Sequence, residues 1–74
     1  MAGPVKRSVT IAGHATSVTL EPVFWRALQR AAAEEALPLA TLVTRIDAER
    51  VRGPNAPNLA SALRVWLMER ATAA

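Results

Sequence analysis

The chain has 74 residues, of which 51% are hydrophobic and 4% aromatic, with a formal net charge of +3 and no cysteine. This length allows one small domain, and the lack of cysteine excludes disulfides and thiolate metal sites as stabilising devices. A chain this short buries only about 60% of its unfolded surface, so the high apolar content favours a homodimer that completes the core.

Positive charge gathers toward the two ends of the sequence. Residues 1–20 carry Lys6 and Arg7 and no acid, a sum of +2, whereas residues 21–51 sum to −1 and residues 52–74 to +2. A basic N-terminal segment favours contact with a polyanion.

Neither a membrane span nor a secretory signal is predicted. No apolar run approaches the ~20 residues that a membrane span requires. Polar residues, rather than a continuous apolar stretch, follow Lys6 and Arg7. We therefore expect a cytoplasmic protein with no membrane partner.

The N-terminal third has the pattern of a strand. Residues 1–5 are predicted to be a flexible leader, and residues 6–74 a single domain. Within that domain, residues 8–20 alternate β-branched with small polar side chains, the period of a half-buried strand. Gly13 interrupts the alternation, so the segment is either two short strands or one bent strand.

A lone strand would leave a ladder of backbone N–H and C=O groups unpaired, so this segment needs a partner. Residues 8–12 could fold back as a hairpin, or the same strand of a second copy could pair with it. The sequence leaves both arrangements open, and the second would also account for the apolar excess.

Apolar residues recur at spacings of three and four in the rest of the chain, which is typical of helices. The spacing predicts a first helix over residues 22–36. A second is expected from Pro38 to about Val51, because proline is tolerated in the first turn of a helix. A loop rich in Gly and Pro follows, and Asn58 is a suitable cap for a third helix that ends at about Arg70.

The sequence gives little support for catalysis. A nucleophile needs a base and an orienting group within reach, but His14 is the only histidine and no acid precedes Glu21. The neighbouring carboxylates of the helices lie beside arginines on polar faces. We therefore predict no enzymatic activity, no cofactor and no metal site.

The end of the predicted strand offers a more specific surface. One of its faces carries Ala15, Ser17 and Thr19, and the other carries Val18 and Leu20. A paired β-ribbon with short polar side chains fits the major groove of DNA, where hydroxyls can donate to or accept from base edges. A solvent-exposed face would fit the same residues equally well.

Several stretches of the chain together form a recognisable pattern: residues 6–11 (KRSVTI), 13–14 (GH), 16–22 (TSVTLEP), 24–25 (FW), 42–43 (LV), 46–47 (ID) and 58–65 (NLASALRV). This pattern resembles the ribbon-helix-helix superfamily of Arc-like and methionine-repressor-like DNA-binding proteins. It is more closely similar to a compact bacterial ribbon-helix-helix domain family, and the resemblance covers about residues 6–68.

The resemblance implies an intertwined homodimer whose N-terminal strands pair antiparallel and lie in a DNA groove. It also implies that the N-terminus of the second helix approaches phosphate, as the helix dipole favours. By position, Ala15, Ser17 and Thr19 would face DNA, whereas Val18 and Leu20 would face the core.

Two features depart from the family pattern. Ala15 stands where members often carry a basic residue. The second helix usually begins with a hydroxyl cap, but neither Pro38 nor Ala40 has one, which leaves Thr41 as the nearest hydroxyl. The anchoring contacts are then expected from Lys6, Arg7 and His14.

These observations lead to one leading hypothesis, a bacterial transcriptional regulator, such as a repressor, that binds double-stranded DNA as a homodimer. The predicted fold is mainly α with an N-terminal β-ribbon: a ribbon-helix-helix unit plus a third, C-terminal helix. The predicted DNA-binding residues are Lys6, Arg7, His14, Ala15, Ser17, Thr19 and Thr41. The predicted dimer core consists of Val18, Leu20, Phe24, Trp25, Leu28, Leu42, Val43 and Ile46.

The alternative hypothesis is a protein-interaction module, such as an antitoxin. Such a module would bind a partner protein through its C-terminal helix. Val65 and Met68, beside Trp66, would then form the binding surface.

Overall fold

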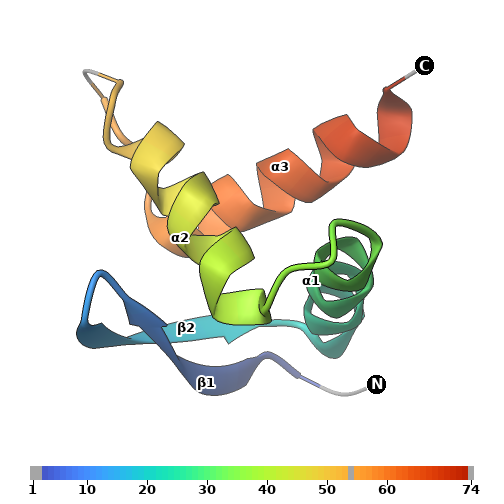
Figure 1. The fold of residues 1–74 in the computed structure, drawn as a ribbon, viewed down its shortest axis with the longest axis horizontal. Coiled ribbons are helices and arrows are strands. Elements are labelled where there is room, and N and C mark those ends of the chain that lie inside the picture. Colours follow the sequence, from blue (N-terminus) through green and yellow to red (C-terminus); the bar gives the residue numbers. More distant parts are fainter. Residues whose placement is uncertain (1–2, 54, 74) are drawn as a thin grey trace.

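The second and third helices lie over one face of a two-stranded hairpin, and the first helix lies beside the end of the hairpin opposite its turn (Figure 1). The computed structural model describes residues 3–53 and 55–73. The predicted fold class, a β-ribbon followed by three helices, is confirmed. The elements are β1 (Val5–Ile11), β2 (His14–Leu20), α1 (Pro22–Glu34), α2 (Leu39–Arg50) and α3 (Leu59–Thr72).

The hairpin decides between the two pairings that the sequence left open. β1 pairs antiparallel with β2 of the same chain, and Ile11 lies opposite His14 across the turn. β1 begins at Val5, inside the segment expected to be a leader. A second copy is therefore not needed to complete this ribbon, whereas the resemblance implied pairing between the N-terminal strands of two copies.

The turn of the hairpin has two residues, Ala12 and Gly13, with φ angles of 50° and 81°. Positive φ at both positions is the requirement of a type I′ turn, whose twist matches that of the flanking strands. Glycine adopts this conformation freely, but the Cβ of Ala12 makes it unfavourable.

Replacing Ala12 by asparagine is expected to stabilise the protein by about 0.5–1 kcal/mol, because asparagine tolerates the left-handed conformation better than alanine. Thermal unfolding would show this as a midpoint a few degrees higher than that of the wild type. Ala12→Val is the control, since a β-branched residue at positive φ should lower the midpoint. A lower midpoint for Ala12→Asn would contradict the turn assignment.

The core lies between the inner face of the hairpin and the three helices. Val9 and Ile11 of β1 and Val18 and Leu20 of β2 are all buried and point toward the helices. Trp25 is the largest fully buried side chain, with 1% exposed. The remaining buried residues are Leu28, Ala31, Ala32, Leu42, Val43, Ile46, Leu63 and Leu67.

All the residues predicted for a dimer core lie in the core of one chain. Seven of the eight are buried, and Phe24 is half-buried and packs against the others. Their apolar character is thus accounted for without a second copy.

The first helix ends two residues earlier than predicted, at Glu34. Ala36 takes a φ of 55°, and the N–H of Leu37 donates to the carbonyl of Ala32 at 2.9 Å. This is a Schellman motif, in which a left-handed residue turns the chain out of the helix. The periodic apolar pattern continues past that point, which is why the pattern alone overestimates the helix length.

The other two helices agree with the sequence to within two residues. α2 begins at Leu39, with Pro38 as its N-cap, and ends at Arg50. As predicted, Asn58 caps α3, and its side chain accepts a hydrogen bond from the backbone N–H of Ser61 at 2.8 Å. α3 continues to Thr72, one half-turn beyond the predicted end. No helix in the described residues is long and apolar enough to cross a membrane.

Candidate nucleic-acid interface

The hairpin has an outer face that points away from the helices. The strand register places Lys6 opposite Thr19, Ser8 opposite Ser17 and Thr10 opposite Ala15. Side chains of paired residues lie on the same side of a sheet, and the buried residues of both strands alternate with them. The outer face therefore consists of six exposed residues: Lys6, Ser8, Thr10, Ala15, Ser17 and Thr19.

Four of these residues were predicted to contact DNA, whereas Ser8 and Thr10 were missed. Both alternate with the buried Val9 and Ile11, so the period-two pattern already contained the signal. The full set of outer residues became clear only from the strand register, because pairing of β1 with β2 adds the polar residues of β1 to the face formed by β2.

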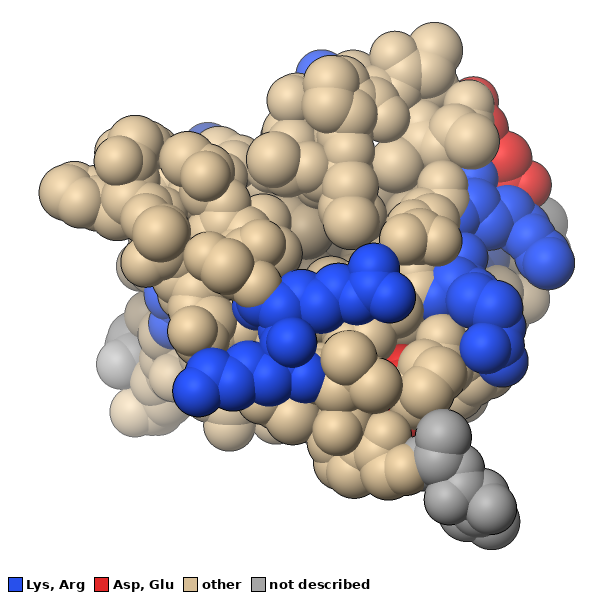
Figure 2. Space-filling view, turned by 90° about the horizontal axis from the view of Figure 1, so that it is seen from below, with Lys and Arg blue, Asp and Glu red and all other residues tan. Residues whose placement is uncertain are grey.

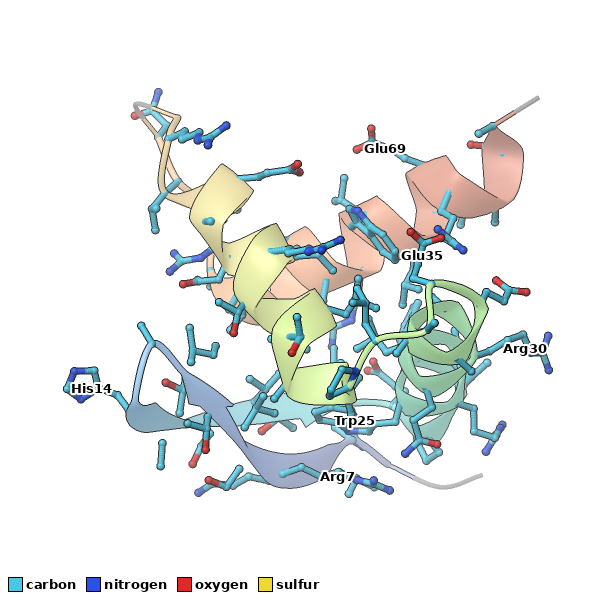
Figure 3. The ribbon with its side chains drawn as sticks, viewed as in Figure 1. Arg7, His14, Trp25, Arg30, Glu35 and Glu69 are labelled. Atoms are coloured by element: carbon cyan, nitrogen blue, oxygen red, sulfur yellow. The ribbon has the colours of Figure 1, made fainter. Side chains whose placement is uncertain are left out.

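Three predicted DNA-binding residues do not lie on the outer face: Thr41 belongs to α2, and the other two lie on the ribbon. Arg7 and His14 pair with Val18 and Ile11, so their side chains leave from the inner side of the ribbon. His14 is exposed at the hairpin end and points away from the body of the protein (Figure 3).

Arg7 is exposed but held in place by α1. Its guanidinium carbon lies 5.3 Å from the centroid of the Trp25 ring, within the range of a cation–π contact. The indole Nε1 of Trp25 also donates to the backbone carbonyl of Val5 at 2.9 Å. One buried tryptophan thus fixes the beginning of β1 and orients a cation next to it.

The salt bridges engage most of the acidic side chains but fewer of the basic ones. Arg50, Arg64 and Arg70 form salt bridges with four of the six acidic side chains. Glu49 and Glu69 form no salt bridge in the part of the chain that the structure describes. The other six basic residues form no salt bridge within the described residues: Lys6, Arg7, Arg26, Arg30, Arg45 and Arg52.

Four of the six unpaired cations belong to β1 and α1. Viewed from the ribbon side, basic side chains cross the centre of the molecule and follow the edge where α1 lies (Figure 2). Acidic atoms are visible mainly at one margin of this face. The ribbon side can therefore attract a polyanion, as the basic N-terminal segment suggested.

Thr41 lies exposed in the first turn of α2, a helix that packs against β1. Its backbone N–H donates to the carbonyl of Pro38 at 3.1 Å, and no side chain caps the helix. The Thr41 hydroxyl is thus not used as a cap, in agreement with the missing cap noted in the sequence.

An ion pair joins α3 to the junction between β2 and α1. Arg64 donates to Glu21 Oε1 through Nη2 at 2.9 Å and through Nε at 3.2 Å, and it also lies over the Phe24 ring. The pKa of the Glu21 carboxyl lies below its ordinary value, first because its own backbone N–H hydrogen-bonds to it and second because Arg64 does. Both groups are partly exposed, so the pair contributes modestly to stability.

The lowered pKa of Glu21 predicts a loss of stability in acid. The folded state binds the proton less tightly than the unfolded chain, so the contribution is complete at pH values well above the ordinary pKa of glutamate and disappears as the pH falls through the folded pKa. The difference in melting temperature between wild type and Glu21→Gln should therefore shrink from neutral pH toward about pH 3. Glu69→Gln, which changes an exposed carboxylate that forms no ion pair in the described structure, should show no such trend.

A comparison with protein families matches residues 4–71 to the ribbon-helix-helix domain. The chain belongs to the ribbon-helix-helix family. This family is in general a DNA-binding and regulatory one, without enzymatic activity. The family typically binds DNA as dimers.

A solved structure supports the same fold. The chain is similar to an uncharacterized protein from Bordetella pertussis Tohama I, with 34% sequence identity and a TM-score of 0.77. The match covers 93% of this chain and 56% of that one, so this ribbon-helix-helix chain spans little more than half of that protein's length. No curated protein matches significantly. Within the described residues, no group of three or more His, Asp or Glu side chains could hold a metal ion.

Proposed function

We propose that the protein is a sequence-specific DNA-binding transcriptional regulator of the repressor type, which inserts the outer face of its ribbon into the major groove. The observation that carries this proposal is the composition of that face. Its six residues are exposed, four of them bear hydroxyls and one is a lysine, and the hairpin contains no acid.

The dimensions and chemistry of the ribbon suit base recognition. The major groove is about 12 Å wide and admits two strands about 4.8 Å apart. Ser17 lies opposite Ser8 at the middle of the face, and Thr19 lies opposite Lys6 near one end. Hydroxyls can donate to or accept from the base edges, and Lys6 and Arg7 can neutralise phosphates. In this proposal Ala15 lies against the bases, while Thr41 and His14 lie at the rim.

The proposal includes a homodimer that acts in the bacterial cytoplasm, where the DNA lies. The exposed Val5 and Val23 (37% and 57%) support a second copy. Two copies would double the ribbon surface and read two half-sites. Sedimentation at micromolar concentration tests the proposed homodimer. A monomer at that concentration would contradict the dimer but would leave the proposed contact between ribbon and DNA standing.

Selection from random DNA duplexes, followed by titration of the selected site against scrambled DNA, tests the proposed function. We expect one enriched sequence, bound more tightly than scrambled DNA by about 1000-fold or more. Affinity should fall as salt rises, because phosphate contacts release counterions. Lack of binding to any duplex at low salt would reject the proposal.

One surface favours a second candidate, the protein-interaction module. A groove of about 260 Å³ between α2 and α3 is lined by Trp66 and by the unpaired Glu49 and Glu69. Val65 also lines this groove and is 55% exposed, and Met68, which follows it by one turn of α3, is 63% exposed. This combination fits an apolar segment with basic residues from another protein. A stoichiometric partner that binds wild type but not a Val65→Ser, Met68→Ser variant would support this candidate.

A further inference from the structure

Arg26 and Arg30 of α1 have no role in the proposed ribbon contacts, yet both are exposed and form no salt bridge in the described part of the chain. They lie one helical turn apart, so their side chains leave the same face of α1 with Cβ atoms about 6 Å apart. Two like charges at this spacing repel each other and destabilise an isolated helix. An anion bound between or beside them would remove that repulsion.

The two carboxylates nearest to this pair interact with an arginine of α3. Glu34 is four residues after Arg30, but it accepts from Arg70 of α3 at 3.1 Å. Arg70 also reaches Glu35 at 3.4 Å, so α3 engages both acids at the end of α1. Arg26, Arg30 and Arg70 carry three positive charges against the two negative charges of these acids, so a net charge of +1 remains at this end of the molecule.

The position of α1 connects these charges to the ribbon. Figure 3 shows Arg30 pointing outward from α1, on the side away from the hairpin tip. From below, the basic side chains at the α1 edge and those across the ribbon share one face of the molecule (Figure 2). A duplex that lies against the ribbon would bring its backbone past this edge.

We propose that Arg26 and Arg30 form a second, sequence-independent contact with the phosphate backbone beside the groove that the ribbon occupies. This inference rests on the proposed DNA-binding function and extends its surface from the ribbon to α1. Arginine suits this role because its planar guanidinium can bind phosphate through two hydrogen bonds. Such contacts set affinity and orientation but do not read sequence.

The test compares three variants of the full chain by titration with the selected duplex and with scrambled DNA. Arg26→Ala, Arg30→Ala removes the proposed contact. Arg45→Ala, Arg52→Ala makes the same change of charge at two exposed, unpaired arginines of α2 and the loop after it. Ser17→Ala, Thr19→Ala changes the ribbon and leaves the charge unaltered. Because all six positions lack side-chain hydrogen bonds within the described residues, each variant should fold, which circular dichroism can verify.

The α1 variant should weaken binding to both duplexes by similar factors and reduce the salt dependence. Lowering the salt from about 200 to about 50 mM should raise the affinity of both proteins for DNA. If each arginine makes one phosphate contact per chain, the factor by which the affinity of the α1 variant rises should be about 12 times smaller, per chain, than the factor for wild type. The ribbon variant should instead lose discrimination between the two duplexes. If the affinity of the α1 variant had the same salt dependence as that of the Arg45→Ala, Arg52→Ala control, the inference would be overturned. The proposed function would still be tested separately, by the loss of discrimination in the ribbon variant. Wild type that binds neither duplex would overturn both.

Discussion

Trp25→Ala is expected to remove a large part of the free energy of unfolding of the protein. Truncation of a buried tryptophan costs about 3–5 kcal/mol, whereas a domain of this size has a total stability of about 4–11 kcal/mol. The indole fills the core at 1% exposure, and its Nε1 donates to the Val5 carbonyl. Its loss removes packing and also frees the beginning of β1. Circular dichroism during urea titration would measure the change in the free energy of unfolding.

Two further variants separate packing from the hydrogen bond. Trp25→Phe keeps an aromatic ring but cannot donate to the Val5 carbonyl, so a cost of about 1 kcal/mol is expected from the hydrogen bond, together with a smaller packing loss. Trp66→Ala makes the same truncation at a half-buried tryptophan and should cost clearly less than Trp25→Ala. Equal costs at the two tryptophans would contradict the central position of Trp25 in the core.

Ser17→Glu is expected to weaken specific DNA binding strongly while the protein stays folded. Ser17 lies in the middle of the outer face, opposite Ser8, and its side chain is exposed. A carboxylate there would meet base acceptors and phosphates, and like charges at an interface cost several kcal/mol. A loss of about 3 kcal/mol, or roughly 100-fold in affinity, would appear in a fluorescence-anisotropy titration.

Ala48→Glu is the matched control for this change. It adds the same charge at an exposed position of α2, away from the ribbon. We expect its affinity for DNA to change by only a few-fold, through the lower net charge. If both variants lost affinity equally, net charge rather than the ribbon face would explain binding.

The faces of the strands were predictable because side-chain alternation is a local property of an extended chain. Val18 and Leu20 are buried and Ser17 and Thr19 exposed, as the period of two indicates. The pairing partner was not predictable in the same way. The Ala12-Gly13 turn lacks the Asn-Gly or Asp-Gly sequence that normally marks a type I′ hairpin, so nothing local favoured the hairpin over pairing with a second copy.

The candidate site shows the same division. Lys6 and the small residues of the second strand were found from the sequence, whereas Ser8 and Thr10 joined them only through the register. The sequence also grouped Arg7 with Lys6, although the two side chains leave opposite faces of the ribbon. The side chains of neighbouring residues on a strand always point to opposite faces of the sheet. Which of the two points outward became clear only from the pairing of β1 with β2.

By itself the sequence determined the order of strand and helices, the capping of α3 by Asn58 and the family to which the chain belongs. These depend on local periodicity and on side chains a few residues apart. Only the tertiary structure decided which charges are neutralised. Arg70 pairs with Glu34 and Arg64 with Glu21 across separations of 36 and 43 residues. Because ion pairing depends on distance in space, the basic ribbon side emerges only when α3 engages the acids at both ends of α1.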